Sequence, residues 1–163
     1  MKHQPRLLFL FVFIACASLL GFALYLQLAQ HLLPCPLCVA QRLAYWLTGL
    51  TALLAFLHNP GALGRRIYSA LLALPALAGA LVAGRHAWLV RYPESFDCGI
   101  SPEEKFLNAL PFAQWWPGMF EANGDCAHAT GWKFLSLMIP DWSLVWFLIF
   151  GAVAVYLFFA KER

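Results

Sequence analysis

The residues with the clearest chemical potential are two cysteines with two residues between them, Cys35 and Cys38. A disulfide closed between such near neighbours forms a small ring that is usually reactive and reducible, unlike a long structural staple. Pro34 and Pro36 favour extended backbone before the second cysteine, and the apolar stretch that follows predicts a helix. Cys38 is then expected in or near the first helical turn, where unpaired N–H groups and the helix dipole favour a thiolate.

Arg42 follows Cys38 by four residues, which places it one turn further along the same helix face. A cation on that face stabilises either a thiolate or a reduced, anionic electron acceptor, and we favour this interpretation. The alternative is an anchor without a chemical role, whose long side chain reaches from an apolar span to the membrane boundary.

The chain has five cysteines, and Cys98 and Cys126 form a second, widely spaced couple. With Cys35 and Cys38 they fit a redox relay, a zinc site of four thiolates, or inert structural disulfides. Structural zinc sites usually combine two close pairs, whereas 27 residues separate Cys98 from Cys126. We therefore predict redox chemistry and no metal, and leave the pairing open because four cysteines allow three connectivities. Cys16 lies within an apolar run and is expected to be a small buried side chain.

The composition indicates a membrane protein. Of the 163 residues, 62% are hydrophobic and 12% are charged, and the mean hydropathy is +0.68, more apolar than soluble domains. About 20 apolar residues cross a bilayer, and four stretches qualify, at 7–26, 39–57, 67–90 and 142–160. We predict one domain over 1–163, an all-α integral membrane bundle of four transmembrane helices. No nucleic-acid binding is expected, because basic residues form no long run.

Basic residues set the expected orientation. They flank the first span on its N-terminal side, lie between the second and third spans, and follow the fourth span: Lys2, Arg6, Arg65, Arg66, Lys161 and Arg163. Short segments rich in Lys and Arg stay cytoplasmic, so both termini are predicted on that side. The run 7–26 also resembles a signal peptide, but it is long and lacks a good cleavage site, so we expect it to be retained.

Two loops are then expected on the outer side, at about 27–38 and 91–141, and they hold the four cysteines where disulfides persist. The second loop contains an aromatic segment at 106–120 that is interrupted by Pro111 and Pro117. This pattern predicts a short helix along the membrane surface.

Several motifs resemble the bacterial disulfide-bond-formation protein B (DsbB) family. They occur in order over essentially the whole chain, and this makes the resemblance specific. They are Pro34-Cys-x-x-Cys38 with Arg42, Arg91-Tyr-Pro93 before Cys98, Trp116-Pro-x-x-Phe120 before Gly124-Asp-Cys126, and Pro140-x-Trp142 at the last span.

The resemblance implies an inner-membrane protein-disulfide oxidoreductase with periplasmic loops. Such a protein reoxidises a periplasmic thioredoxin-fold dithiol oxidase, DsbA, and passes two electrons to ubiquinone or menaquinone in the membrane quinone pool. By position, Cys98 would form the mixed disulfide with the partner and Cys126 would be its pair. Cys35 would exchange with that pair, and Cys38 would face the quinone.

The resemblance also implies that Arg42 and His86 lie near the quinone. Gln41 departs from the carboxylate expected at its position, so a proton-delivery role is not carried over to it.

Two alternatives remain: a membrane protein whose disulfides only fasten its loops, and a quinone-linked enzyme of the vitamin K epoxide reductase type. In the second of these, we would expect the Cys-x-x-Cys late in the chain.

Overall fold

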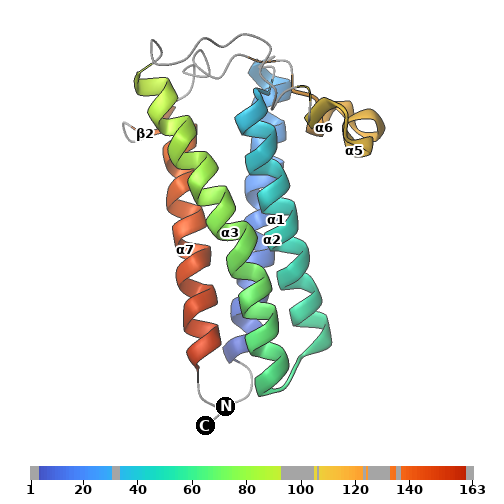
Figure 1. The fold of residues 1–163 in the computed structure, drawn as a ribbon, viewed down its shortest axis with the longest axis vertical. Coiled ribbons are helices and arrows are strands. Elements are labelled where there is room, and N and C mark those ends of the chain that lie inside the picture. Colours follow the sequence, from blue (N-terminus) through green and yellow to red (C-terminus); the bar gives the residue numbers. More distant parts are fainter. Residues whose placement is uncertain are drawn as a thin grey trace.

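Four long helices form the body of the protein in the computed structural model, which describes residues 4–30, 34–92, 105, 107–122, 124, 133–134 and 137–160. The helices are α1 (Gln4–Gln30), α2 (Pro36–His58), α3 (Ala62–Arg91) and α7 (Ile139–Phe159). Each is long and apolar enough to cross a membrane. The predicted all-α, four-helix membrane bundle is therefore confirmed, and successive helices run in opposite directions (Figure 1).

Each helix is longer than the apolar run that predicted it, because residues that flank the run continue the helix. The fourth helix, α7, begins at Ile139 and not at 142, and ends at Phe159. Pro140 lies in its first turn, where a missing N–H costs nothing, and Asp141 follows it in the same turn. A carboxylate is favoured there by the helix dipole.

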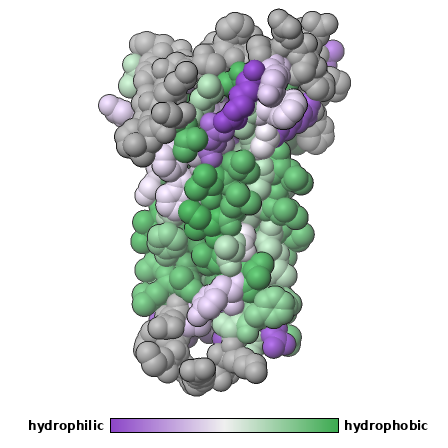
Figure 2. Space-filling model, turned by 90° about the vertical axis from the view of Figure 1, so that its left-hand side faces the viewer, coloured by the Kyte–Doolittle hydropathy of each residue, from purple (hydrophilic) through white to green (hydrophobic). Residues whose placement is uncertain are grey.

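The outer surface of the bundle is apolar along most of its length. Large side chains such as Leu54, Leu74 and Leu81 are more than half exposed, and the face drawn in Figure 2 is mostly hydrophobic over the middle of the bundle. Lipid tails match this surface, so the exposure is favourable in a bilayer and not in water.

Helix α3 is central, because it packs against both α2 and α7, whereas α1 packs mainly against α2 (Figure 1). Gly79 permits the close approach of α3 to α7, since a Cβ atom there would overlap the ring of Phe147. Phe147 in turn stacks on Tyr45 of α2, with ring centroids 4.2 Å apart. Small residues at helix contacts are the usual way that membrane helices gain dispersion energy.

The second outer loop contains short elements: α5 (Pro111–Trp115), α6 (Pro117–Phe120), β1 (Lys133–Phe134) and β2 (Leu137–Met138). The two strands are antiparallel and pair Lys133 with Met138 and Phe134 with Leu137. The expected short helix in this loop is present as two short helices beside the ends of α1 and α2 (Figure 1). Their position along the membrane surface stays a prediction.

Candidate redox site

The Cys-x-x-Cys lies at the start of α2, as the sequence predicted. Cys35 is the N-cap residue, in extended backbone, and its Sγ accepts a hydrogen bond from the backbone N–H of Cys38 at 3.3 Å. The two Sγ atoms are 3.1 Å apart, so a small rotation brings them to the bonded distance of about 2.0 Å. Cys35 is buried and Cys38 is half-buried, so Cys38 is the more accessible of the two thiols.

His86 of α3 contacts Cys35, with its Nε2 atom 3.8 Å from the Sγ of Cys35. Its other ring nitrogen, Nδ1, is 3.0 Å from the amide nitrogen of Gln41. All three side chains are buried. An amide nitrogen can only donate, so Nδ1 accepts and the proton of the neutral ring is on Nε2, facing the sulfur.

Arg42 is buried, with 7% of its surface exposed, and its guanidinium interacts electrostatically with both Cys38 and Cys35. Its Nη1 atom also donates to the backbone carbonyl of Met119 in α6 at 3.2 Å. The predicted spacing on one helix face therefore brings Arg42 to the thiols. The burial contradicts a side chain that only reaches outward to the membrane boundary.

Trp46 continues the same face of α2, one turn beyond Arg42. Its ring packs edge-on against Trp116, with centroids 6.4 Å apart. The indole Nε1–H of Trp46 is buried and has no hydrogen-bond partner among the described residues. A buried donor of this kind costs about 1–3 kcal/mol unless an acceptor satisfies it.

The short helices of the second loop are held against this site by backbone carbonyl and amide contacts. Gln27 of α1 donates to the carbonyl of Gly118 at 2.9 Å. Asn108 donates to the carbonyl of Ala122 at 3.1 Å and accepts from its N–H at 2.9 Å, which closes the segment between them. The hydrogen bonds from Gln27 to Gly118 and from Arg42 to Met119 hold α6 against α1 and α2.

Cys98 and Cys126 are outside the described residues. The nearest described part of their loop is Gly124, whose N–H donates to the carbonyl of Pro34 at 3.0 Å. Since Pro34 directly precedes Cys35, the second loop is joined to the first beside the buried thiol.

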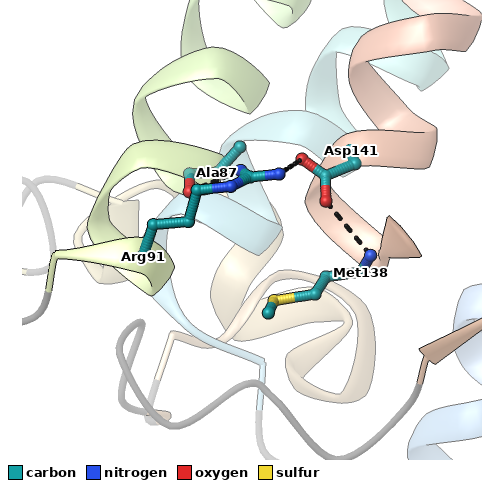
Figure 3. Close-up of polar contacts among 4 residues, drawn as sticks. All are labelled: Ala87, Arg91, Met138 and Asp141. Atoms are coloured by element: carbon teal, nitrogen blue, oxygen red, sulfur yellow. Dashed lines mark hydrogen bonds and ion pairs between the residues drawn. The ribbon is translucent and has the colours of Figure 1, made fainter. Parts of the chain in front are cut away.

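An ion pair joins α3 and α7, the two helices that the second loop connects. Arg91, at the end of α3, contacts Asp141 Oδ1 at 2.9 Å and donates to the carbonyl of Ala87 at 2.9 Å. The other carboxylate oxygen of Asp141 accepts from the N–H of Met138 at 3.1 Å (Figure 3). At the opposite end of the bundle, Arg65 of α3 donates to the carbonyl of Ala160, just after α7. Arginines therefore tie α3 to α7 at both ends.

Sequence reasoning missed three members of the site: Gln41 as the partner of His86, Trp46, and the Met119 carbonyl. Trp46 could have been found by extending the spacing that relates Cys38 to Arg42 by one more turn. Gln41 and His86 are 45 residues apart, and no local pattern joins them. A backbone carbonyl leaves no signal in residue type.

A four-helix membrane bundle with a dithiol pair at the start of its second helix has the features of a membrane thiol–disulfide oxidoreductase. The model of the family described as "Disulfide bond formation protein DsbB" matches residues 5–157 of this chain. The chain therefore belongs to the DsbB family. It is 64% identical to Disulfide bond formation protein B of Nitrosomonas eutropha over 156 residues, covering 96% of each chain. It is 66% identical to the protein of the same name from Nitrosomonas europaea over 149 residues, covering 91% of this chain and 90% of the other.

Proposed function

We propose that this protein reoxidises a periplasmic thioredoxin-fold dithiol oxidase of the DsbA type and passes the two electrons to ubiquinone or menaquinone. Membership of the DsbB family supports a role in disulfide formation. The observation that carries the proposal is the setting of Cys35 and Cys38, which lie together at a helix start with a buried histidine and a buried arginine beside them.

The buried thiol is set up for exchange. The Cys35 sulfur receives the Cys38 N–H at 3.3 Å, and the Nε2–H of His86 lies 3.8 Å away on another side. Hydrogen bonds to the charged form lower the cost of a thiolate. Cys35 is therefore the residue expected to exchange with the disulfide of the second loop.

The loop cysteines complete the proposed relay. The partner's thiolate attacks the Cys98–Cys126 disulfide, and the partner's second thiol then resolves the mixed disulfide with Cys98, which leaves the partner oxidised. The reduced loop pair reduces Cys35–Cys38 by a second exchange. Each exchange forms one S–S bond and breaks another, so two electrons and two protons move inward without net loss.

Residues along the face of α2 that begins at Cys38 fit a quinone. Arg42 supplies a cation near both thiols, and Trp46 supplies a buried N–H donor that no described residue accepts. Cys38 is the more accessible thiol of the pair. Arg42 and Trp46 would hold the carbonyl oxygens, while His86 lies on the Cys35 side. When bound, a quinone supplies the two-electron acceptor that closes the Cys35–Cys38 disulfide.

We place the protein in the bacterial inner membrane, with both termini in the cytoplasm. The described beginning of α1 and end of α7 lie at the same end of the bundle, opposite the start of α2 (Figure 1), where Cys35 and Cys38 lie. The basic residues of the termini and of the loop between α2 and α3 support a cytoplasmic position for that end.

The direct test uses the purified protein in nanodiscs with a reduced thioredoxin-fold dithiol protein and a soluble quinone. One quinone should be reduced for each disulfide formed in the partner. Cys38→Ser should abolish quinone reduction, while Cys16→Ala, a change at a buried thiol of α1, should leave it intact. Unchanged turnover in Cys38→Ser would overturn the proposal and favour disulfides that only fasten the loops.

A further inference from the structure

Three side chains at the start of α2 and in α3 form a donor set of the kind that binds soft metal ions. The Sγ atoms of Cys35 and Cys38 and a ring nitrogen of His86 all lie within 4.8 Å of one another. We propose that the reduced site binds one thiophilic divalent ion of the Zn²⁺ class, and that this binding blocks the oxidation of the Cys35–Cys38 dithiol. The blocking of turnover rests on the proposed function, whereas the binding does not.

Two of the three distances between ligand atoms are close to those of a tetrahedral site, and the third, from the Cys38 sulfur to a ring nitrogen of His86, is within 4.8 Å. With bonds of about 2.3 Å to sulfur and about 2.0 Å to nitrogen, two ligand atoms lie about 3.5–3.8 Å apart. The Cys35 sulfur and the His86 Nε2 atom are already 3.8 Å apart. The two sulfurs, at 3.1 Å, must separate by about 0.6 Å, which a rotation of the half-buried Cys38 side chain would supply.

The surroundings favour a metal–thiolate bond. The N–H of Cys38 already donates to the Cys35 sulfur, and such a bond stabilises a thiolate ligand. Metal-bound histidine normally donates its second ring nitrogen to an acceptor. Gln41 can supply this acceptor. Rotation of its amide by half a turn presents the Gln41 Oε1 atom to the Nδ1–H of His86, and the lone pair of the His86 Nε2 atom is then free to bind the metal.

The charge at the site also balances. Two thiolates neutralise a divalent ion, so the buried guanidinium of Arg42 faces a neutral cluster and not a cation. Two sulfurs and an imidazole select Zn²⁺ over Mg²⁺ or Ca²⁺, which prefer oxygen ligands. A water molecule would occupy the fourth coordination position of the metal, on the accessible side of Cys38.

Metal binding and oxidation exclude each other chemically. Binding releases the two thiol protons and transfers no electrons, whereas disulfide closure removes two electrons and two protons. A bound ion holds the sulfurs about 3.7 Å apart, and the S–S bond of about 2.0 Å cannot form until the ion leaves. The site would therefore respond to the metal only in its reduced state.

The test titrates Co²⁺ into protein in which Cys16, Cys98 and Cys126 are replaced by alanine, so that only the proposed thiols remain. Reduction uses a phosphine, because thiol reductants bind metal. We expect a cobalt–thiolate charge-transfer spectrum that saturates at one ion per chain and disappears when Zn²⁺ is added. The same protein, once its disulfide is closed, should give no spectrum, and this comparison needs no substitution at the site.

Substitutions then identify the ligands. Cys35→Ser and Cys38→Ser should lose the spectrum, and His86→Ala should weaken binding at least tenfold. His58→Ala, at the other end of the bundle, is the matched control and should bind as the parent does. Binding by the oxidised protein, binding that survives Cys35→Ser, or no loss in His86→Ala would overturn the inference. Because no quinone or dithiol partner is present, a failure here leaves the proposed oxidase activity standing.

Discussion

Gln41 and His86 form a buried contact between α2 and α3, with 3.0 Å between the amide nitrogen of Gln41 and the Nδ1 atom of His86. The orientation of the Gln41 amide sets the tautomer of His86: with the amide nitrogen toward Nδ1, the ring proton is on Nε2 and faces the Cys35 sulfur. The position where the resemblance led us to expect a carboxylate is thus the one that contacts the histidine. A neutral amide does this without titrating.

Gln41→Leu should slow turnover about fivefold to tenfold, because the loss of one buried hydrogen bond costs about 1 kcal/mol and each tenfold in rate is about 1.4 kcal/mol. Gln41→Glu should keep most of the rate but add an ionisation to the pH dependence of kcat. The new carboxyl group would then titrate beside His86, whose ring also lies within 4.8 Å of the Cys35 and Cys38 sulfurs.

The measurement is steady-state quinone reduction from pH 5 to pH 9. Thr48→Val is the matched control, because it removes a different buried side-chain hydrogen bond of α2. If Gln41→Glu and the wild type have superimposable pH profiles, Gln41 does not act through His86.

Arg42→Met should lower kcat/KM for quinone reduction by about tenfold to a hundredfold. Two unit charges about 4 Å apart interact by about 4 kcal/mol at an effective dielectric of about 20, and solvent at the half-buried Cys38 reduces this. Arg42→Lys keeps the charge but loses the planar fork that also reaches the Met119 carbonyl, so it should be less damaging than Met. Kinetics across quinone concentrations separate weaker binding from slower chemistry. Wild-type kcat and KM in Arg42→Met would leave Arg42 only a structural role, its hydrogen bond to the Met119 carbonyl.

Trp46→Phe tests the buried indole donor. It keeps the aromatic contact with Trp116 but removes the N–H that has no acceptor among the described residues. We expect KM for quinone to rise about fivefold, with kcat nearly unchanged, because one neutral hydrogen bond is worth about 1 kcal/mol. Trp88→Phe, at an exposed position of α3, is the control. An unchanged KM in Trp46→Phe would mean that no quinone oxygen meets this donor.

Asp141→Ala should destabilise the protein by about 1–2 kcal/mol, because it removes both the ion pair with Arg91 and a capping bond at the start of α7. Asp141→Asn keeps an acceptor for the Met138 N–H and should cost less, since the Arg91 side chain is 48% exposed and its ion pair is screened. Thermal unfolding in detergent checks the order. Equal losses in the two variants would mean that the ion pair, and not the cap, carries the stability.

The sequence predicted the bundle well because its evidence is local and additive. Four apolar runs, a proline-flanked Cys-x-x-Cys and an arginine one turn later all follow from spacing along a single element. The contacts that complete the site join different elements. The pairs Gln41–His86, Arg42–Met119 and Arg91–Asp141 depend on how α2, α3, α6 and α7 pack, and side-chain type alone does not determine them. Cys98 and Cys126 lie outside the described residues, so their roles stay predictions.

Cys98→Ser tests whether electrons reach the protein through the second loop. The N–H of Gly124 is bonded to Pro34 beside Cys35, so this loop meets the buried pair even though Cys35 itself has almost no exposed surface. A folded partner cannot reach Cys35 directly, whereas a small dithiol can reach the half-buried Cys38. Oxidation of the thioredoxin-fold partner should therefore fall at least a hundredfold in Cys98→Ser, while oxidation of dithiothreitol at high concentration continues at a comparable rate. Cys38→Ser, the matched comparison, should lose both activities. Near wild-type oxidation of the protein partner by Cys98→Ser would show that Cys98 is not the point of attack, and equal loss with both substrates would place its role in the Cys35–Cys38 site itself.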